Sequence, residues 1–105
     1  MSEPVVVTAY FHPLPGKHDA VVEALHPAIA AVHAEPGCQL YAIHRAPDDT
    51  VVMIEKWSSE EYLDVHGSGG AVATLNENLE GLLARPVEVT RLRPIPSGTP
   101  EQGQL

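Results

Sequence analysis

The first apolar segment, from Val5 to His12, is hydrophobic on both of its alternating faces, and this constrains the fold more than any other feature. Both alternate sets are apolar over most of their length: Val5, Val7, Ala9 and Phe11, and Val6, Thr8, Tyr10 and His12. β-Branched and aromatic residues favour strands, and a strand that is apolar on both faces must be covered on both. The chain is therefore predicted to build a sheet that is buried on two sides.

A helix is predicted from Lys17 to His33. Pro13-Leu14-Pro15-Gly16 ends the strand before it. One apolar stripe then recurs at spacings of three and four: Val22, Leu25, Ile29 and Val32. Pro27 should kink this helix or loosen the turn before it. Glu35-Pro36-Gly37 should end the segment, because Pro36 cannot continue a helix and Gly37 tolerates the left-handed turn after it.

The next two segments are predicted to form a β-hairpin. Gln39 to Arg45 and Val51 to Trp57 both have the composition of strands, and the first is expected to begin near Cys38. Ala46-Pro47-Asp48-Asp49-Thr50 separates them, and this connection is rich in turn-forming residues and of hairpin length.

The second half is predicted to hold an interrupted helix. Ser58 and Glu61 have the spacing of a capping box, so a helix should start directly after Trp57. Gly67-Ser68-Gly69-Gly70 interrupts it, and a second helical stretch runs from Ala71 to Ala84.

A last strand is predicted from Pro86 to Ile95, and residues 97–105 form a flexible C-terminal tail. The order strand, helix, strand, strand, helix, strand over residues 1–96 predicts a single domain of the α+β class. It is a ferredoxin-like βαββαβ sandwich with a four-stranded antiparallel sheet. Helices on one face leave the other face apolar and uncovered, so we expect a homodimer joined sheet to sheet.

The charge of the chain excludes one class of partner. Six Lys or Arg against 14 Asp or Glu give a formal net charge of -8, without the clustered basic surface that nucleic acid requires. The single cysteine, Cys38, rules out an internal disulfide and should behave as a small buried hydrophobe. The sequence shows neither a signal segment nor an apolar run of membrane-spanning length, so we expect a cytoplasmic protein without a membrane partner.

Several short motifs follow one another in an informative order: Pro15-Gly16-Lys17, Glu35-Pro36-Gly37-Cys38 with Tyr41, Glu55-Lys56-Trp57, and His66. In their order and spacing, residues 4–95 resemble the antibiotic biosynthesis monooxygenase (ABM) family of small dimeric α+β barrel proteins, which includes cofactor-independent quinol monooxygenases. The resemblance implies a pocket between sheet and helices in each subunit. It also implies a phenol, quinol or similar small aromatic substrate, and neither flavin nor metal.

Three positions depart from the family. Ala71 stands where many relatives carry a second histidine, and Met53 stands where oxygenases of aromatic polyketides often place an asparagine. The strand from Val5 to His12 lacks the asparagine of the haem-degrading relatives, which argues against haem degradation. These departures keep two other functions open: a non-catalytic small-molecule-binding dimer, and an isomerase of a small oxidised metabolite.

His66 is the predicted base, because an imidazole titrates near neutrality and can take a phenolic proton. Trp57 is the second catalytic candidate, as a stacking wall with an indole donor. Five further residues are predicted to contact substrate: Tyr41, Tyr62, Tyr10, Glu55 and His44. Glu55 either supports an arginine across the sheet or acts as the base itself. Each candidate also has a structural interpretation, His66 as a half-buried helix-end residue and the aromatics as plain core.

The six histidines do not predict a metal site. His26 and His33 share a face of the first predicted helix, but seven residues separate them by about 10 Å along its axis, too far for one ion. We therefore expect no metal and no other cofactor.

Overall fold

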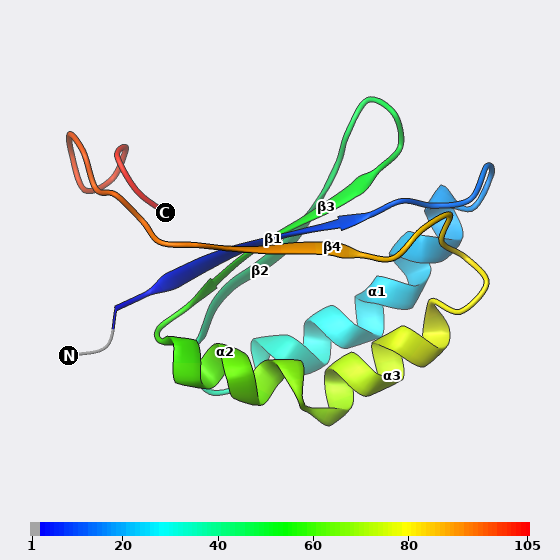
Figure 1. Ribbon diagram of the computed structural model, residues 1–105, viewed down its shortest axis with the longest axis horizontal. Helices are drawn as coiled ribbons and strands as arrows, with labels where there is room; N and C mark the ends of the chain where they lie inside the picture. Colours follow the sequence, from blue (N-terminus) through cyan, green and yellow to red (C-terminus); the bar gives the residue numbers. More distant parts are fainter. Residues whose placement is uncertain (1–2) are drawn as a thin grey trace.

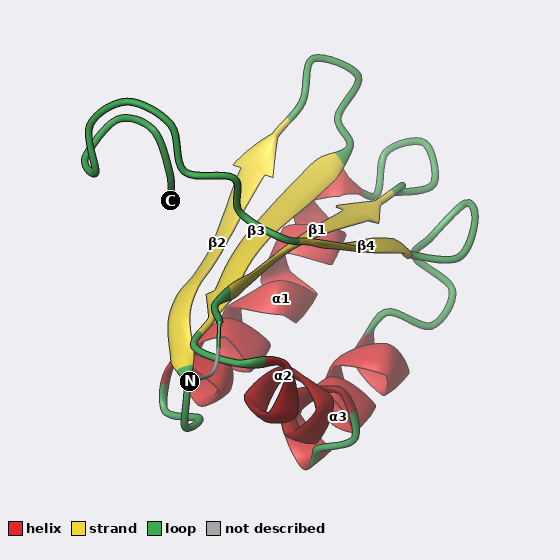
Figure 2. Ribbon diagram, turned by 60° about the vertical axis from the view of Figure 1, so that its left-hand side comes forward, coloured by secondary structure: helices red, strands yellow, loops and turns green. Residues whose placement is uncertain are grey.

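The fold is a four-stranded antiparallel sheet with helices on one face (Figures 1 and 2). The computed structural model describes residues 3–105. Its elements are β1 (Val5–Phe11), α1 (His18–His33), β2 (Cys38–Arg45), β3 (Val51–Trp57), α2 (Glu60–Gly67), α3 (Gly70–Asn78) and β4 (Glu88–Leu92). The sheet order is β2-β3-β1-β4, which confirms the predicted ferredoxin-like α+β arrangement.

The core lies between the sheet and α1. Successive strand residues point to opposite faces, so one alternate set of β1 and one of β3 face the helices. These residues are buried: Val5, Val7, Ala9, Phe11, Val51, Met53, Glu55 and Trp57. α1 runs through Pro27 and buries Val21, Leu25, Ala28 and Val32 against them. The predicted stripe was therefore partly wrong, since Val22 and Ile29 are only half-buried.

Three predicted boundaries were also wrong. The N-cap of α2 is Ser59 rather than Ser58, because the Ser59 hydroxyl accepts the bond from the Tyr62 backbone N–H at 3.3 Å. α3 ends at Asn78, although its apolar spacing continues through turns as far as Leu82. β4 covers only residues 88–92. An apolar pattern reports which side chains are buried, and turns can bury them as well as a helix can.

The second face of the sheet has no helix over it among residues 3–105. On β2 and β3 this face carries half-buried apolar side chains: Leu40, Ala42, Val52 and Ile54. The stretch after β4, which includes the predicted tail at 97–105, forms no helix or strand. Lys56 on this face donates a hydrogen bond to the backbone oxygen of Leu105. Within the described residues, no helix has the length and apolar character needed to span a bilayer.

We predict that Ser59→Ala lowers the free energy of unfolding by about 0.5–2 kcal/mol, because it removes the N-cap acceptor of α2. Ser58→Ala is the matched control, since its side chain caps nothing and it should change the stability by less than about 0.5 kcal/mol. Urea denaturation of both variants measures the difference. Equal losses of stability in the two variants would contradict the assignment of Ser59 as the N-cap.

Candidate functional site

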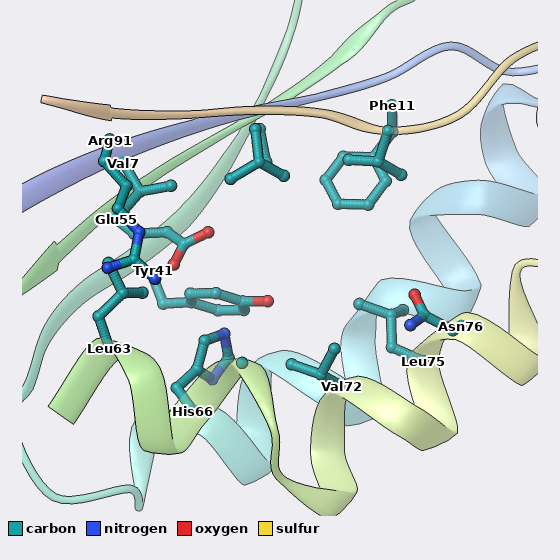
Figure 3. Close-up of a pocket in the computed structure, with 14 residues that line it drawn as sticks. Val7, Phe11, Tyr41, Glu55, Leu63, His66, Val72, Leu75, Asn76 and Arg91 are labelled. Atoms are coloured by element: carbon teal, nitrogen blue, oxygen red, sulfur yellow. The ribbon is translucent and has the colours of Figure 1, made fainter. Parts of the chain in front are cut away.

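A cavity of about 290 Å³ lies between the helix-facing side of the sheet and helices α2 and α3 (Figure 3). Most of its wall is apolar, with contributions from Val7, Ala9, Phe11, Leu63, Val72 and Leu75. Five polar side chains interrupt this wall: Tyr41, Glu55, His66, Asn76 and Arg91. An apolar cleft with a few convergent polar groups is the usual form of a small-molecule site.

His66 enters the cavity from α2 and is held by a carboxylate. Its Nδ1 lies 2.8 Å from Oε1 of Glu35, and its side chain is 7% exposed. In the neutral imidazole this contact places the proton on Nδ1, so that Nε2 is left as an acceptor. Figure 3 shows the ring beneath Tyr41, with one nitrogen turned toward the sheet. His66 is therefore oriented as a base would be.

Aromatic rings fix the imidazole from two sides. The Trp57 ring lies 4.5 Å from the His66 ring between centroids, and the Tyr41 ring lies 5.5 Å away in an edge-on arrangement. Such packing leaves the imidazole little freedom to rotate.

Glu55 is a buried carboxyl group on β3. Its Oε1 accepts a hydrogen bond of 2.9 Å from the indole Nε1–H of Trp57. Among residues 3–105 no lysine, arginine or histidine lies within ion-pair distance of it. Burial raises the pKa of Glu55, although the bond from Trp57 and the nearby His66 oppose the shift. A carboxyl group in this setting favours its neutral form.

Tyr41 lies directly across from Glu55 on β2. The phenol is buried, and burial together with the charge of Glu55 raises the pKa of Tyr41 well above its usual range. Within the described chain its hydroxyl makes no hydrogen bond, and Figure 3 shows it pointing along the cavity between Val72 and the sheet. Tyr41 therefore offers a neutral phenol to a ligand.

The structure does not bring the other predicted site residues to the cavity wall. Trp57 is fully buried behind His66 and Glu55. Tyr62 is 44% exposed and packs over Gly37, where an added Cβ would clash with the Tyr62 ring. Tyr10 and His44 occupy the alternate positions of their strands, so they lie on the opposite face of the sheet.

Sequence reasoning missed three residues. Glu35 was interpreted only as part of a helix stop, yet it supplies the carboxylate that binds His66. Arg91 and Asn76 line the cavity without having been singled out. The suggested partnership of Glu55 with an arginine is not formed by Arg91, whose guanidinium pairs with Asp64 at 2.8 Å.

Within the described part of the chain, no three His, Cys, Asp or Glu side chains are grouped so that they could hold a metal ion. Two of the three histidines of α1 contact backbone oxygens. His18 Nδ1 lies 2.9 Å from the backbone oxygen of Asp49, and His33 Nε2 lies 3.0 Å from that of Tyr41.

Comparison with known proteins identifies relatives along most of the chain. The sequence profile of the family described as "Antibiotic biosynthesis monooxygenase" matches residues 4–78. A Mycobacterium tuberculosis protein named "Putative monooxygenase Rv0793" is 33% identical over 96 residues, which are 90% of this chain and 95% of that protein. The solved structure of Rv0793 superposes with a TM-score of 0.83 at 32% identity, covering 92% of this chain and all of that one. The Pseudomonas aeruginosa protein PA3566 superposes with a TM-score of 0.81 at 27% identity, covering 90% and 97%.

We predict that Glu55→Gln changes the dependence of stability on pH. Because the pKa of Glu55 is raised in the folded state, the unfolded chain loses this proton first as the pH rises, at the ordinary glutamate pKa of 4.5. The wild type therefore loses stability from about that pH up to the raised folded pKa. Glutamine cannot ionise and should not show this loss, while its carbonyl can still accept the Trp57 bond.

The measurement is urea denaturation of both proteins at several pH values from 4 upward. The advantage of the Gln variant over the wild type should grow as the pH rises. A difference that is constant with pH would show that Glu55 ionises as it does in the unfolded chain.

Proposed function

Because this chain belongs to the antibiotic biosynthesis monooxygenase family, we propose that it is a cofactor-independent monooxygenase that acts on a small phenol or quinol. The observation that carries the proposal is the Glu35–His66 pair, a base oriented by a carboxylate at the wall of a largely apolar cavity. The cavity size favours a ligand of a few fused rings at most.

The proposed reaction begins with proton transfer. The substrate hydroxyl gives its proton to Nε2 of His66, and the Glu35 carboxylate stabilises the imidazolium that forms. The resulting phenolate is electron-rich and can pass an electron to O₂ in the cavity. The apolar wall limits the competing access of water.

The overall conversion balances without an added reductant. A quinol and O₂ give a hydroxyquinone and water, with one oxygen atom entering the ring and the other leaving as water. The quinol supplies all the electrons that reduce the oxygen. The protein is then required to bind the quinol, remove its proton and hold the anion near O₂.

We also propose that the protein works as a homodimer. The second face of the sheet carries apolar side chains on β2 and β3, and Ile54 on β3 is flanked by Thr8 of β1 and Ala42 of β2. An uncovered apolar face of this kind is buried most simply against a second copy of itself.

We predict that His66→Ala lowers the rate of oxygen consumption by about a hundredfold to ten-thousandfold, the range expected for loss of a general base. Glu35→Gln should cause a smaller loss, since the imidazole stays but its orientation weakens. The assay is oxygen uptake with a panel of quinols and anthrones. His26→Ala on the exposed side of α1 is the control and should retain wild-type activity.

Full activity of His66→Ala would show that His66 is not the base and that another residue removes the proton. Tight binding of the same compounds without oxygen uptake by the wild type would instead indicate a non-catalytic binding dimer. Conversion of a compound without oxygen uptake would indicate an isomerase.

We predict that light scattering gives a mass near twice 11.3 kDa. Ile54→Arg should produce monomers, because it places a charge in the centre of the apolar face. The control is Val65→Arg, which changes an exposed apolar residue on α2 away from the sheet and should leave the dimer intact. A wild-type monomer would contradict the proposed interface.

A further inference from the structure

The side chains of Tyr41 and Glu55 meet at one side of the cavity. Tyr41 and Glu55 are directly opposed residues of adjacent strands, and both face the helices. Directly opposed side chains start about 5 Å apart at their Cβ atoms, so their polar ends can reach one ligand atom. Both residues line the cavity beside His66 (Figure 3).

Each of the two side chains has an oxygen that is free to bind a ligand. One oxygen of Glu55 accepts the bond from Trp57, and its second oxygen has no hydrogen-bond partner among the described residues. The Tyr41 hydroxyl has none either. Among the described residues, every side-chain polar atom that is fully buried has a hydrogen-bond partner. An oxygen without a partner must therefore have accessible surface. The free oxygens of both side chains are therefore open to the cavity.

The charged surroundings of Glu55 do not force it to ionise. The titratable groups near it are His66 on α2, Glu35 before β2, and Tyr41 and Cys38 on β2. Arg91 on β4, the one arginine among the described residues that lines the cavity, is paired with Asp64 and Glu60. Burial without a paired cation disfavours the carboxylate and raises the pKa of Glu55.

We propose that Tyr41 and Glu55 form an oxyanion-binding pair, in which the phenol and the carboxylic acid both donate hydrogen bonds to one substrate oxygen. His66 removes the proton from the other end of the same conjugated system. This inference rests on the proposed function, because it assigns the group that holds the anion made by His66. A tyrosine beside a neutral carboxylic acid is a known way to stabilise an enolate or phenolate.

The pair gives the site an activity that requires no oxygen. For a ketone with an acidic C–H, the proton moves to Nε2 of His66 and the C–H electron pair moves through the conjugated system to the carbonyl oxygen. Tyr41 and Glu55 hold that oxygen as it becomes negative. Return of a proton from His66 to carbon restores the ketone, so no electron is gained or lost overall.

The experiment is anaerobic deuterium exchange of anthrone and 2-tetralone in D₂O, followed by NMR at the acidic methylene. The wild type should accelerate exchange over buffer. Tyr41→Phe and Glu55→Met each remove a donor and should slow the enzymatic exchange by about a hundredfold to a thousandfold. Glu55→Gln should stay within about tenfold of the wild type, since its amide N–H donates to the ligand while its carbonyl accepts from Trp57.

Glu23→Gln, on the exposed side of α1, is the matched control and should not change the rate. The rescue by glutamine is the discriminating result. If Glu55→Gln loses as much activity as Glu55→Met, the carboxyl group acts as a base or proton carrier, and the pair is overturned. Tyr41→Phe keeps the test valid should Glu55→Met fold poorly, because it leaves the Trp57–Glu55 bond intact.

Oxygen uptake on the same compounds in air separates this inference from the proposed function. Exchange with the expected variant pattern but without oxygen uptake would refute the monooxygenase and keep the pair. Oxygen uptake that Tyr41→Phe and Glu55→Met leave unchanged would refute the oxyanion-binding pair and keep the monooxygenase. A wild type that accelerates neither exchange reaction would also overturn the pair.

Discussion

The hydrogen bond between Trp57 and Glu55 is the contact on which the site depends. The indole is fully buried, so its N–H must find an acceptor inside the protein. Glu55, two residues earlier on the same face of β3, supplies that acceptor and is thereby held in the core. The same indole packs against His66 and sets the position of α2 over the sheet. One buried N–H thus accounts for a carboxyl group in an apolar cavity and for the orientation of the imidazole beside it.

The two carboxyl groups near His66 have different environments, and this difference separates their roles. Glu35 is 24% exposed and lies 2.8 Å from Nδ1 of His66, so it is placed to stabilise the imidazolium. Glu55 is buried, bonded only to an indole, and has its pKa raised by burial. Acid and base chemistry in one cavity requires such a division, since two carboxylates in equal environments would titrate alike.

The sequence predicted the order and type of the elements well, because each depends on local signals. The hairpin of β2 and β3 and the Gly-rich break between α2 and α3 match the structure closely. Helix ends were less predictable, since Ser58 and Ser59 are equally good caps by composition. The Glu35–His66 pair was out of reach for another reason. Its members are 31 residues apart, and only the packing of α2 against the turn between α1 and β2 brings them together.

The position of Tyr41 shows why alternation alone could not assign the cavity face. β2 pairs with β3 through a register shift between Cys38 and Leu40, so Cys38 lies opposite Trp57 while Tyr41 lies opposite Glu55. Without the extra residue, Leu40 would face Glu55 and the phenol would point to the other side of the sheet. A bulge of this kind re-aims a side chain at a functional site. Since both faces of these strands are apolar, no hydrophobic pattern in the sequence marks the shift, and the donor opposite Glu55 depends on it.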